Sequence, residues 1–186
     1  MSTALVLVDV INDFFDPGGV NFHASYDHLH GAINQLVRVA VENGRPVIHA
    51  VERHRPGPDF EFEKLPVHCL EGSWDAAVPS WLFEQEQHVV VPKRRYSGFF
   101  GTDLDLLLRE RKVRRLVVAG VKSHVCIRAT IQDAFAFGYE ALLPREATGS
   151  NRQNLHEASL EDIERYLGRV VSLSEGLKAL QAEGSQ

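Results

Sequence analysis

The chain has 186 residues, a formal net charge of −5, 44% hydrophobic residues and 24% charged residues. These values are ordinary for a globular protein, and the length suits a single domain spanning residues 1–186. Charges of both signs are mixed along the chain without a basic face, which argues against a nucleic-acid partner.

The first ten residues, MSTALVLVDV, lack the basic segment and the cleavage site of a signal peptide. Asp9 interrupts their apolar run, so we expect no membrane span. The two cysteines, Cys69 and Cys126, are consistent with a reducing compartment. Together these features predict a cytoplasmic protein.

Short apolar runs alternate with helical patterns along the chain. The apolar runs predict strands at 4–8, 46–51, 88–91, 116–119, 141–143 and 170–173. Helical spacing predicts helices at 26–42, 123–137, 155–167 and 175–182, a short helix at 81–83, and one that opens with Thr102 as its N-cap. Because buried strands alternate with helices, the sequence predicts an α/β protein with a parallel six-stranded sheet covered by helices on both sides.

Four polar or reactive residues follow the predicted strands at their carboxyl ends: Asp9, Glu52, Lys93 and Cys126. In parallel α/β sheets, ligands bind outside these ends. We therefore expect these four side chains to form one site that takes a small-molecule substrate.

Cys126 is predicted to lie in the first turn of the helix that follows the strand at 116–119. Backbone N–H groups and the helix dipole at that position favour a thiolate, although a lone buried cysteine is equally compatible with the pattern. If Cys126 is a nucleophile, Asp9 can take its proton, Lys93 can hold its charge, and the N–H groups of Lys122 and Cys126 can form an oxyanion hole. The alternative is that Asp9 caps a loop and Lys93 is a solvated cation.

The sequence contains no G-x-S-x-G, G-x-G-x-x-G or Walker motif, so a serine triad and a nucleotide cofactor are not expected. Hydrolysis by the three residues Asp9, Lys93 and Cys126 would need no cofactor at all.

Three segments resemble the isochorismatase-like cysteine hydrolases, the superfamily of nicotinamidases and N-carbamoylsarcosine amidohydrolase. They are LVLVDVINDF, VVVPKRRYSGFFGTDLDLLLRE and VVAGVKSHVCIRATIQDAFAFGY. The resemblance implies a Rossmann-like three-layer α/β/α sandwich and a catalytic triad of Asp9, Lys93 and Cys126. It also implies a cis peptide between Val121 and Lys122 beside the oxyanion hole.

A second resemblance concerns ERH at 52–54 and PVHC at 66–69, which are similar to the metal-binding segments of nicotinamidases. It implies that Glu52, His54 and His68 bind a divalent metal such as zinc. The alternative is that these three residues shape the pocket without a metal.

Asn12, Phe14, Tyr96 and Phe99 are candidates for the walls of a pocket for a small planar substrate, although aromatic residues at such positions also serve as plain core. Lys122 either reaches an anionic group of the substrate or points to solvent.

Taken together, these features predict a cysteine hydrolase that cleaves a C–N bond of a small amide, carbamoyl or ureido compound through a thioester. A metal-dependent nicotinamidase is the alternative within the enzymes, and a non-catalytic oligomeric scaffold is the alternative outside them. The resemblance also implies a homo-oligomer, a dimer or a tetramer.

Overall fold

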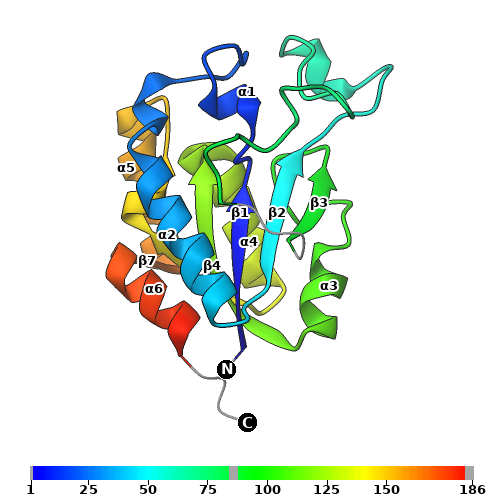
Figure 1. Cartoon of the computed structure of the whole chain (residues 1–186). Coiled ribbons are helices and arrows are strands. Elements are labelled where there is room, and N and C mark those ends of the chain that lie inside the picture. The colour runs from blue at the N-terminus through cyan, green and yellow to red at the C-terminus, as the bar shows by residue number, and fades with distance from the viewer. Residues whose placement is uncertain (1, 84–87, 183–186) are drawn as a thin grey trace.

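The computed structural model describes residues 2–83 and 88–182. One parallel sheet runs through the centre, with the strand order β3-β2-β1-β4-β5-β7 and with β6 paired to β4 (Figure 1). The strands are β1 (Ser2–Val8), β2 (Val47–Glu52), β3 (Val89–Lys93), β4 (Val113–Val121), β5 (Glu140–Pro144), β6 (Thr148–Gly149) and β7 (Arg169–Val171). The predicted α/β class is confirmed, but the sheet has seven strands rather than six. The additional strand, β6, has two residues and no apolar run to reveal it.

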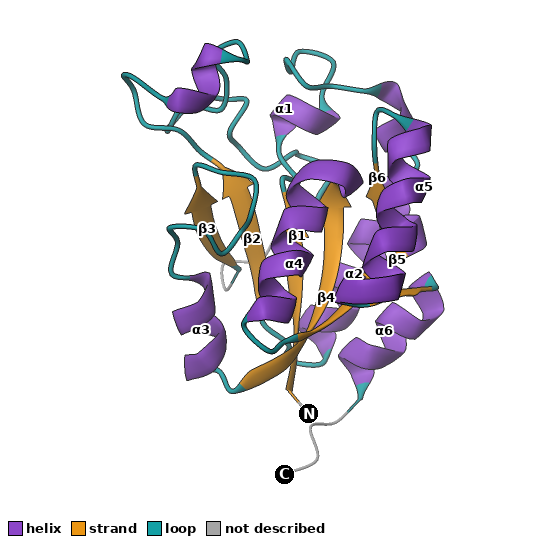
Figure 2. Cartoon of the chain, turned by 180° about the vertical axis from the view of Figure 1, so that it is seen from behind, coloured by secondary structure: helices purple, strands orange, loops and turns teal. Residues whose placement is uncertain are grey.

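Helices cover both faces of the sheet, as the alternating pattern predicts (Figures 1 and 2). The helices are α1 (Asn12–Phe15), α2 (Leu29–Glu42), α3 (Leu104–Glu110), α4 (Arg128–Ala136), α5 (Gln153–Asp162) and α6 (Leu173–Gln181), with 3₁₀ turns at Ala24–Tyr26, Phe60–Glu63 and Arg145–Ala147 and π-helical turns at Ser123–Ile127 and Ile163–Leu167. Helices α2 and α6 lie on one face, and α3, α4 and α5 lie on the other. Within residues 2–83 and 88–182, no helix has the length and hydropathy to cross a membrane.

Two hydrophobic cores lie on the two faces of the sheet. Successive side chains of a strand point to opposite faces, and β1 is apolar on both. Leu5 and Leu7 therefore pack against α2 and α6 in one core, whereas Val6 and Val8 pack in the other core with residues of α3, α4 and α5. This burial on both faces explains why β1 is a continuous apolar run.

The strand order reverses at the centre of the sheet, where β1 pairs with both β2 and β4. After β1, the chain adds β2 and then β3 on one side of the sheet. It then returns to the centre as β4 and adds β5 and β7 on the other side. The carboxyl ends of β1 and β4 thus form a topological switch point. Gly120 brings them close, because it has a φ of 118° and a Cβ there would lie 2.1 Å from the oxygen of Val8. The strand ends that carry Asp9 and the turn to Cys126 are therefore neighbours.

Four local predictions about helices were wrong or incomplete. The predicted helix at 81–83 is a turn, in which Trp81 stacks on His30 with 3.9 Å between ring centroids. Thr102 lies one residue before the N-cap of α3, Asp103, but its hydroxyl oxygen still accepts from the backbone N–H of Leu104 at 3.3 Å. The predicted helices at 123–137 and 155–167 each contain a π-helical turn, which residue spacing alone does not distinguish from an α-helix.

Candidate active site

Asp9, Lys93 and Cys126 lie together at the switch point of the sheet. Lys93 Nζ lies 2.9 Å from Asp9 Oδ2 and 3.7 Å from Cys126 Sγ. A carboxylate oxygen of Asp9 and Cys126 Sγ lie within 4.8 Å of each other. The exposed fractions of the three residues are 0%, 1% and 3%. The structure thus brings a carboxylate, an ammonium group and a thiol into direct contact in a site that is shielded from solvent.

Burial controls the charge state of this site. Burial raises the pKa of the Cys126 thiol well above its ordinary value, and the nearby Lys93 offsets only part of that effect. Burial also raises the pKa of Asp9, against the lowering effect of Lys93. The pKa of Lys93 is raised, because Asp9, Cys126 and Glu52 outweigh the effect of burial. Burial of the site therefore opposes the thiolate that the helix dipole favours.

The backbone fixes the orientation of Asp9. This residue follows β1 with a φ of 52°, a left-handed conformation that is uncommon outside glycine. Its N–H donates to the oxygen of Ala50 at 3.0 Å, and Asp9 Oδ1 accepts from the backbone N–H of Glu52 at 2.7 Å. These two bonds to β2 leave Oδ2 directed at Lys93.

The turn that carries Cys126 begins with a cis peptide between Val121 and Lys122, as the family resemblance implies. The π-helical turn at Ser123–Ile127 follows, and the N–H groups of Val125 and Ile127 both donate to the oxygen of Lys122. Ser123 is fully buried, with its hydroxyl 2.9 Å from His156 Nδ1 in α5. The start of the turn is therefore held by contacts within the turn and by α5.

Glu52, His54 and His68 form a second cluster beside Asp9. Glu52 Oε1 lies 3.1 Å from His54 Nε2 and 2.9 Å from His68 Nε2. Glu61, which the sequence analysis missed, completes the cluster, because one ligand atom from each of the four residues lies within 4.8 Å of the other three. The structure therefore brings together the three residues predicted to bind metal and adds a fourth.

The far nitrogen of each imidazole in this cluster has its own partner. His54 Nδ1 lies 3.0 Å from Asp59 Oδ2, and His68 Nδ1 lies 2.8 Å from the oxygen of Pro66. Such contacts orient the imidazoles of metal ligands and leave Nε2 for the metal. Glu61 Oε1 is buried and has no hydrogen-bond partner. Two oriented imidazoles and two carboxylates, one of which has an oxygen without a partner, fit a divalent cation such as zinc.

The hydrogen bonds of this cluster also determine its charge when no metal is bound. Burial alone would lower the pKa of His68, but its hydrogen bond to Glu52 raises that pKa to about 9. The two histidines in turn hold the pKa of Glu52 below its ordinary value, against the effect of burial.

The residues proposed for the pocket walls differ in their surroundings. Phe14 is buried near Lys122, Asn12 donates to the oxygen of Trp74 at 2.9 Å, and Tyr96 is 45% exposed. Phe99 packs in the core against Phe137 and Tyr139, with centroid distances of 5.4 and 5.8 Å. The surroundings of Phe99 are typical of core packing rather than of a pocket wall.

The side chain of Lys122 contacts two residues of the segment that follows β1. Its Nζ donates to Asn21 Oδ1 at 2.8 Å and lies 5.4 Å from the centre of the Phe14 ring. Asn21 in turn donates to Asp13 at 2.8 Å. The ammonium group of Lys122 therefore contacts residues 14 and 21 rather than extending freely into solvent.

The residues that sequence reasoning missed, Asp59 and Glu61, lie in the segment DFEFE between His54 and His68. Asp59 is buried and accepts from His54, from the backbone of Glu61, and from Arg94 and Arg95. Acidic residues in a loop between two candidate histidine ligands were an available signal, but a loop pattern does not reveal which of them turn inward.

Comparisons with known proteins agree with this fold. A family model described as the isochorismatase domain matches residues 3–175. The ureidoacrylate amidohydrolase RutB of Rhizobium rhizogenes is 32% identical over 204 residues, which cover 93% of this chain and 81% of that protein. The nicotinamidase/pyrazinamidase PncA of Bacillus subtilis has a TM-score of 0.87 at 28% identity and covers 92% of this chain and 100% of its own. A pyrazinamidase of Pyrococcus horikoshii in complex with zinc has a TM-score of 0.85 at 28% identity, with coverages of 92% and 99%.

Proposed function

The chain belongs to the isochorismatase family of hydrolases, which act on C–N amide bonds, and from this premise we propose that Cys126 is the nucleophile of an amidase with Asp9 and Lys93 as its partners. The observation that carries the proposal is the contact of Lys93 Nζ with both Asp9 Oδ2 and Cys126 Sγ. The substrate is a small amide, carbamoyl or ureido compound.

In the first half of the reaction, Sγ of Cys126 attacks the carbonyl carbon of the substrate. Because burial favours the protonated thiol, the attack requires a base, and the adjacent carboxylate of Asp9 accepts the proton. Lys93 touches both atoms, so it stabilises the negative charge as that charge moves from Asp9 to the sulfur. Asp9 then gives the proton to the leaving amine, the C–N bond breaks, and a thioester remains on Cys126.

In the second half, water attacks the thioester carbonyl and Asp9 accepts a proton from that water. The C–S bond breaks, the acid is released, and the proton returns to the sulfur. In both halves an oxyanion forms on the carbonyl oxygen, and we assign the N–H groups of Lys122 and Cys126 to stabilise it. The fixed turn at Ser123–Ile127 supports this assignment, because a rigid backbone orients its N–H groups before the reaction.

We assign Glu52, His54, Glu61 and His68 as the residues that would hold a divalent metal such as zinc. The orphaned oxygen of Glu61 and the two Nε2 atoms at Glu52 Oε1 support this assignment. The pyrazinamidase of P. horikoshii in complex with zinc is consistent with it. When bound, the metal would supply a Lewis acid for a polar atom of the substrate.

Lys122 favours an acidic ureido compound over a neutral amide. Its only side-chain hydrogen bond among the described residues is to the neutral amide of Asn21, and no described carboxylate pairs with it. The curated relative of R. rhizogenes acts, by its name, on ureidoacrylate, which is such an acid. The second candidate is a nicotinamidase, which the cluster around Glu52 and the likeness to the B. subtilis enzyme support.

We also propose that the protein is a homo-oligomer. Phe135 and Phe137, in α4 and just after it, are 58% and 46% exposed. Large exposed apolar side chains such as these are available to contact another chain.

The experiment for the function is a panel of ureidoacrylate, N-carbamoylsarcosine and nicotinamide, each assayed by release of its product with and without added zinc. The proposal expects turnover of at least one ureido compound by the wild type and none by Cys126→Ala. Turnover of nicotinamide alone would establish the second candidate. Failure of every compound with the wild-type protein would favour a non-catalytic scaffold.

A further inference from the structure

A cavity of about 640 Å³ lies at the edge of the sheet, beside β3 and the loop that follows it. Four arginines contribute to its walls: Arg53, Arg55, Arg94 and Arg95. We call it the arginine cavity. None of Asp9, Lys93 and Cys126 lines it, and its volume is in the range of small-molecule sites. It is therefore separate from the candidate active site.

Two of the four guanidinium groups have no anionic partner. Neither Arg53 nor Arg55 forms an ion pair with another described residue, and Arg53 Nε is buried without a hydrogen-bond partner. Two guanidinium groups without an anionic partner at the wall of one cavity favour an anionic ligand there.

The other two guanidinium groups are fixed in place from behind. Arg94 donates to Asp59 Oδ2 through Nε and Nη2 at 3.2 and 2.9 Å, and Arg95 donates to Asp59 Oδ1 at 2.9 Å. The Asp59 carboxylate is fully buried, whereas the arginine side chains are 41% and 37% exposed. Asp59 thus holds both arginines while their remaining N–H groups stay accessible from the cavity.

The rest of the cavity wall limits the chemistry of the ligand. Phe100 lines it and is 66% exposed, which offers an apolar surface to an organic group. Glu71 and Asp103 also line it, so the four positive charges face two negative ones besides the buried Asp59. The excess is positive, and guanidinium groups match phosphate and carboxylate oxygens in geometry.

We propose that the arginine cavity binds a small organic anion through phosphate or carboxylate groups, with Arg53 and Arg55 as its principal donors. Arg94 and Arg95 add donors and share Asp59 with His54, which lies 3.0 Å from Asp59 in the cluster around Glu52. Two residues, an arginine and Asp59, thus lie between the bound anion and that cluster. The proposal does not depend on the hydrolase activity.

The test is isothermal titration calorimetry of the full chain with inorganic phosphate and, separately, with citrate. We expect at least one of the two anions to bind saturably at one site per chain. Binding of phosphate alone or of citrate alone identifies which group the site prefers. Absence of saturable binding of both anions would overturn the proposal.

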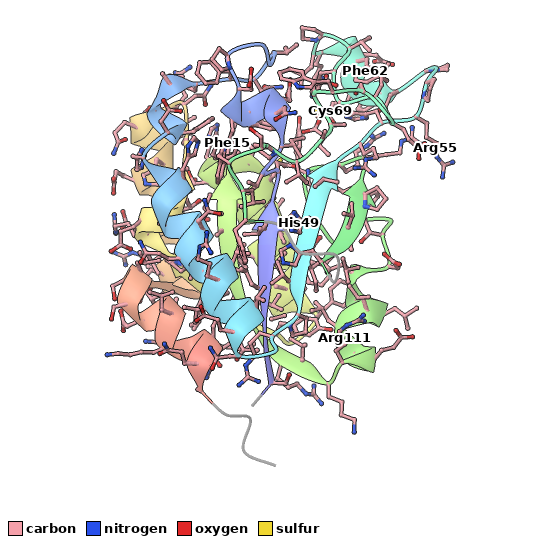
Figure 3. All side chains as sticks on the ribbon, in the orientation of Figure 1. Phe15, His49, Arg55, Phe62, Cys69 and Arg111 are labelled. Atoms are coloured by element: carbon pink, nitrogen blue, oxygen red, sulfur yellow. The ribbon has the colours of Figure 1, made fainter. Side chains whose placement is uncertain are left out.

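The matched variants locate the site. Arg53→Gln/Arg55→Gln should weaken binding by ~10-fold or more, as expected for the loss of charge-assisted hydrogen bonds. Arg111→Gln/Arg114→Gln removes the same charge from exposed positions near the opposite end of the sheet, where Figure 3 labels Arg111 far from Arg55. Because exposed charges at that distance are screened, this control should stay within ~2-fold of the wild type.

An equal loss of affinity in both double variants would show a general charge effect and would contradict the site. Wild-type affinity in Arg53→Gln/Arg55→Gln would place the anion elsewhere, including at the cluster around Glu52, and would also contradict it. If that double variant fails to fold, the single Arg55→Gln substitution at an exposed position should still weaken binding.

Discussion

The ammonium group of Lys93 lies 2.9 Å from the carboxylate of Asp9, and both side chains are completely buried. The same ammonium group lies 3.7 Å from Cys126 Sγ. Transfer of the thiol proton to Asp9 therefore moves a negative charge from one neighbour of Lys93 to another, without removing it from the cation. This relationship explains how a thiol whose pKa is raised by burial can still react.

The first prediction concerns the base. Asp9→Asn keeps the shape of the side chain but cannot accept a proton, so kcat should fall by ~10²–10⁴-fold, the usual contribution of a general base. Steady-state assays of the best substrate in the panel measure this loss.

Asp16→Asn, in the exposed loop after α1, is the control and should retain wild-type activity. If Asp9→Asn retains the kcat of the wild type, Asp9 is not the base. Because the substitution leaves Lys93 buried without its partner, a melting curve must show that the variant is folded.

The second prediction concerns the metal. Protein purified without a histidine tag and incubated with zinc should retain about one equivalent after desalting, measured by elemental analysis. Glu61→Gln should weaken zinc binding by ~10-fold or more, since ligand-shell changes commonly have effects of that size. Glu63→Gln, two residues away and exposed, is the matched control. Equal zinc affinities of the two variants would exclude Glu61 as a ligand. A wild-type protein that retains no zinc would exclude the metal site itself.

The third prediction concerns substrate charge. Lys122→Gln should raise KM for an acidic ureido substrate by ~10-fold with little change in kcat, because it removes a charge-assisted contact to the carboxylate. KM for a neutral amide should stay unchanged. Lys122→Arg keeps the charge and should recover part of the affinity. If the variant changes KM equally for acidic and neutral substrates, Lys122 does not contact the anionic group.

The fourth prediction concerns acid stability. His49, labelled within β2 in Figure 3, is 1% exposed, and its Nε2 lies 3.2 Å from His88 Nδ1. Burial lowers its pKa from 6.5 to about 4. Between these values the unfolded chain binds the proton and the folded chain does not, so the free energy of unfolding falls as the pH falls through this window.

Removing this group should weaken the pH dependence of stability. Between pH 7 and pH 5, the wild type should lose about 2 kcal/mol more than His49→Gln, as measured by urea unfolding. His23→Gln, at an exposed position, should keep the wild-type pH dependence. Equal pH dependence of the wild type and His49→Gln would show that His49 does not contribute to it.

Most of the sheet and the three central residues could be predicted from the sequence, for a physical reason. Parallel strands buried on both faces are continuous apolar runs, and the polar residue that ends each run marks the functional edge. Asp9, Lys93 and Cys126 follow β1, end β3 and follow β4 in this way. The short strand β6 has no such run, so it escaped the prediction.

Other features depend on contacts that a sequence does not display. Asp59 turns inward because it accepts hydrogen bonds from His54, Arg94 and Arg95, and the backbone N–H of Glu61 donates to the same carboxylate. The raised pKa of Cys126 follows from its burial, whereas the sequence revealed only its place at a helix start. The backbone pattern located the cysteine, but that pattern does not show how deeply the side chain is buried.

The central claim is that Cys126 carries the substrate as a thioester. The most direct measurement is mass spectrometry of enzyme quenched during turnover, with the adduct mapped to a peptide. The account predicts an acyl or carbamoyl adduct on the peptide that contains Cys126, none on the peptide that contains Cys69, and no turnover by Cys126→Ala. Turnover by Cys126→Ala at the wild-type rate, or an adduct on Cys69 in place of Cys126, would contradict the account.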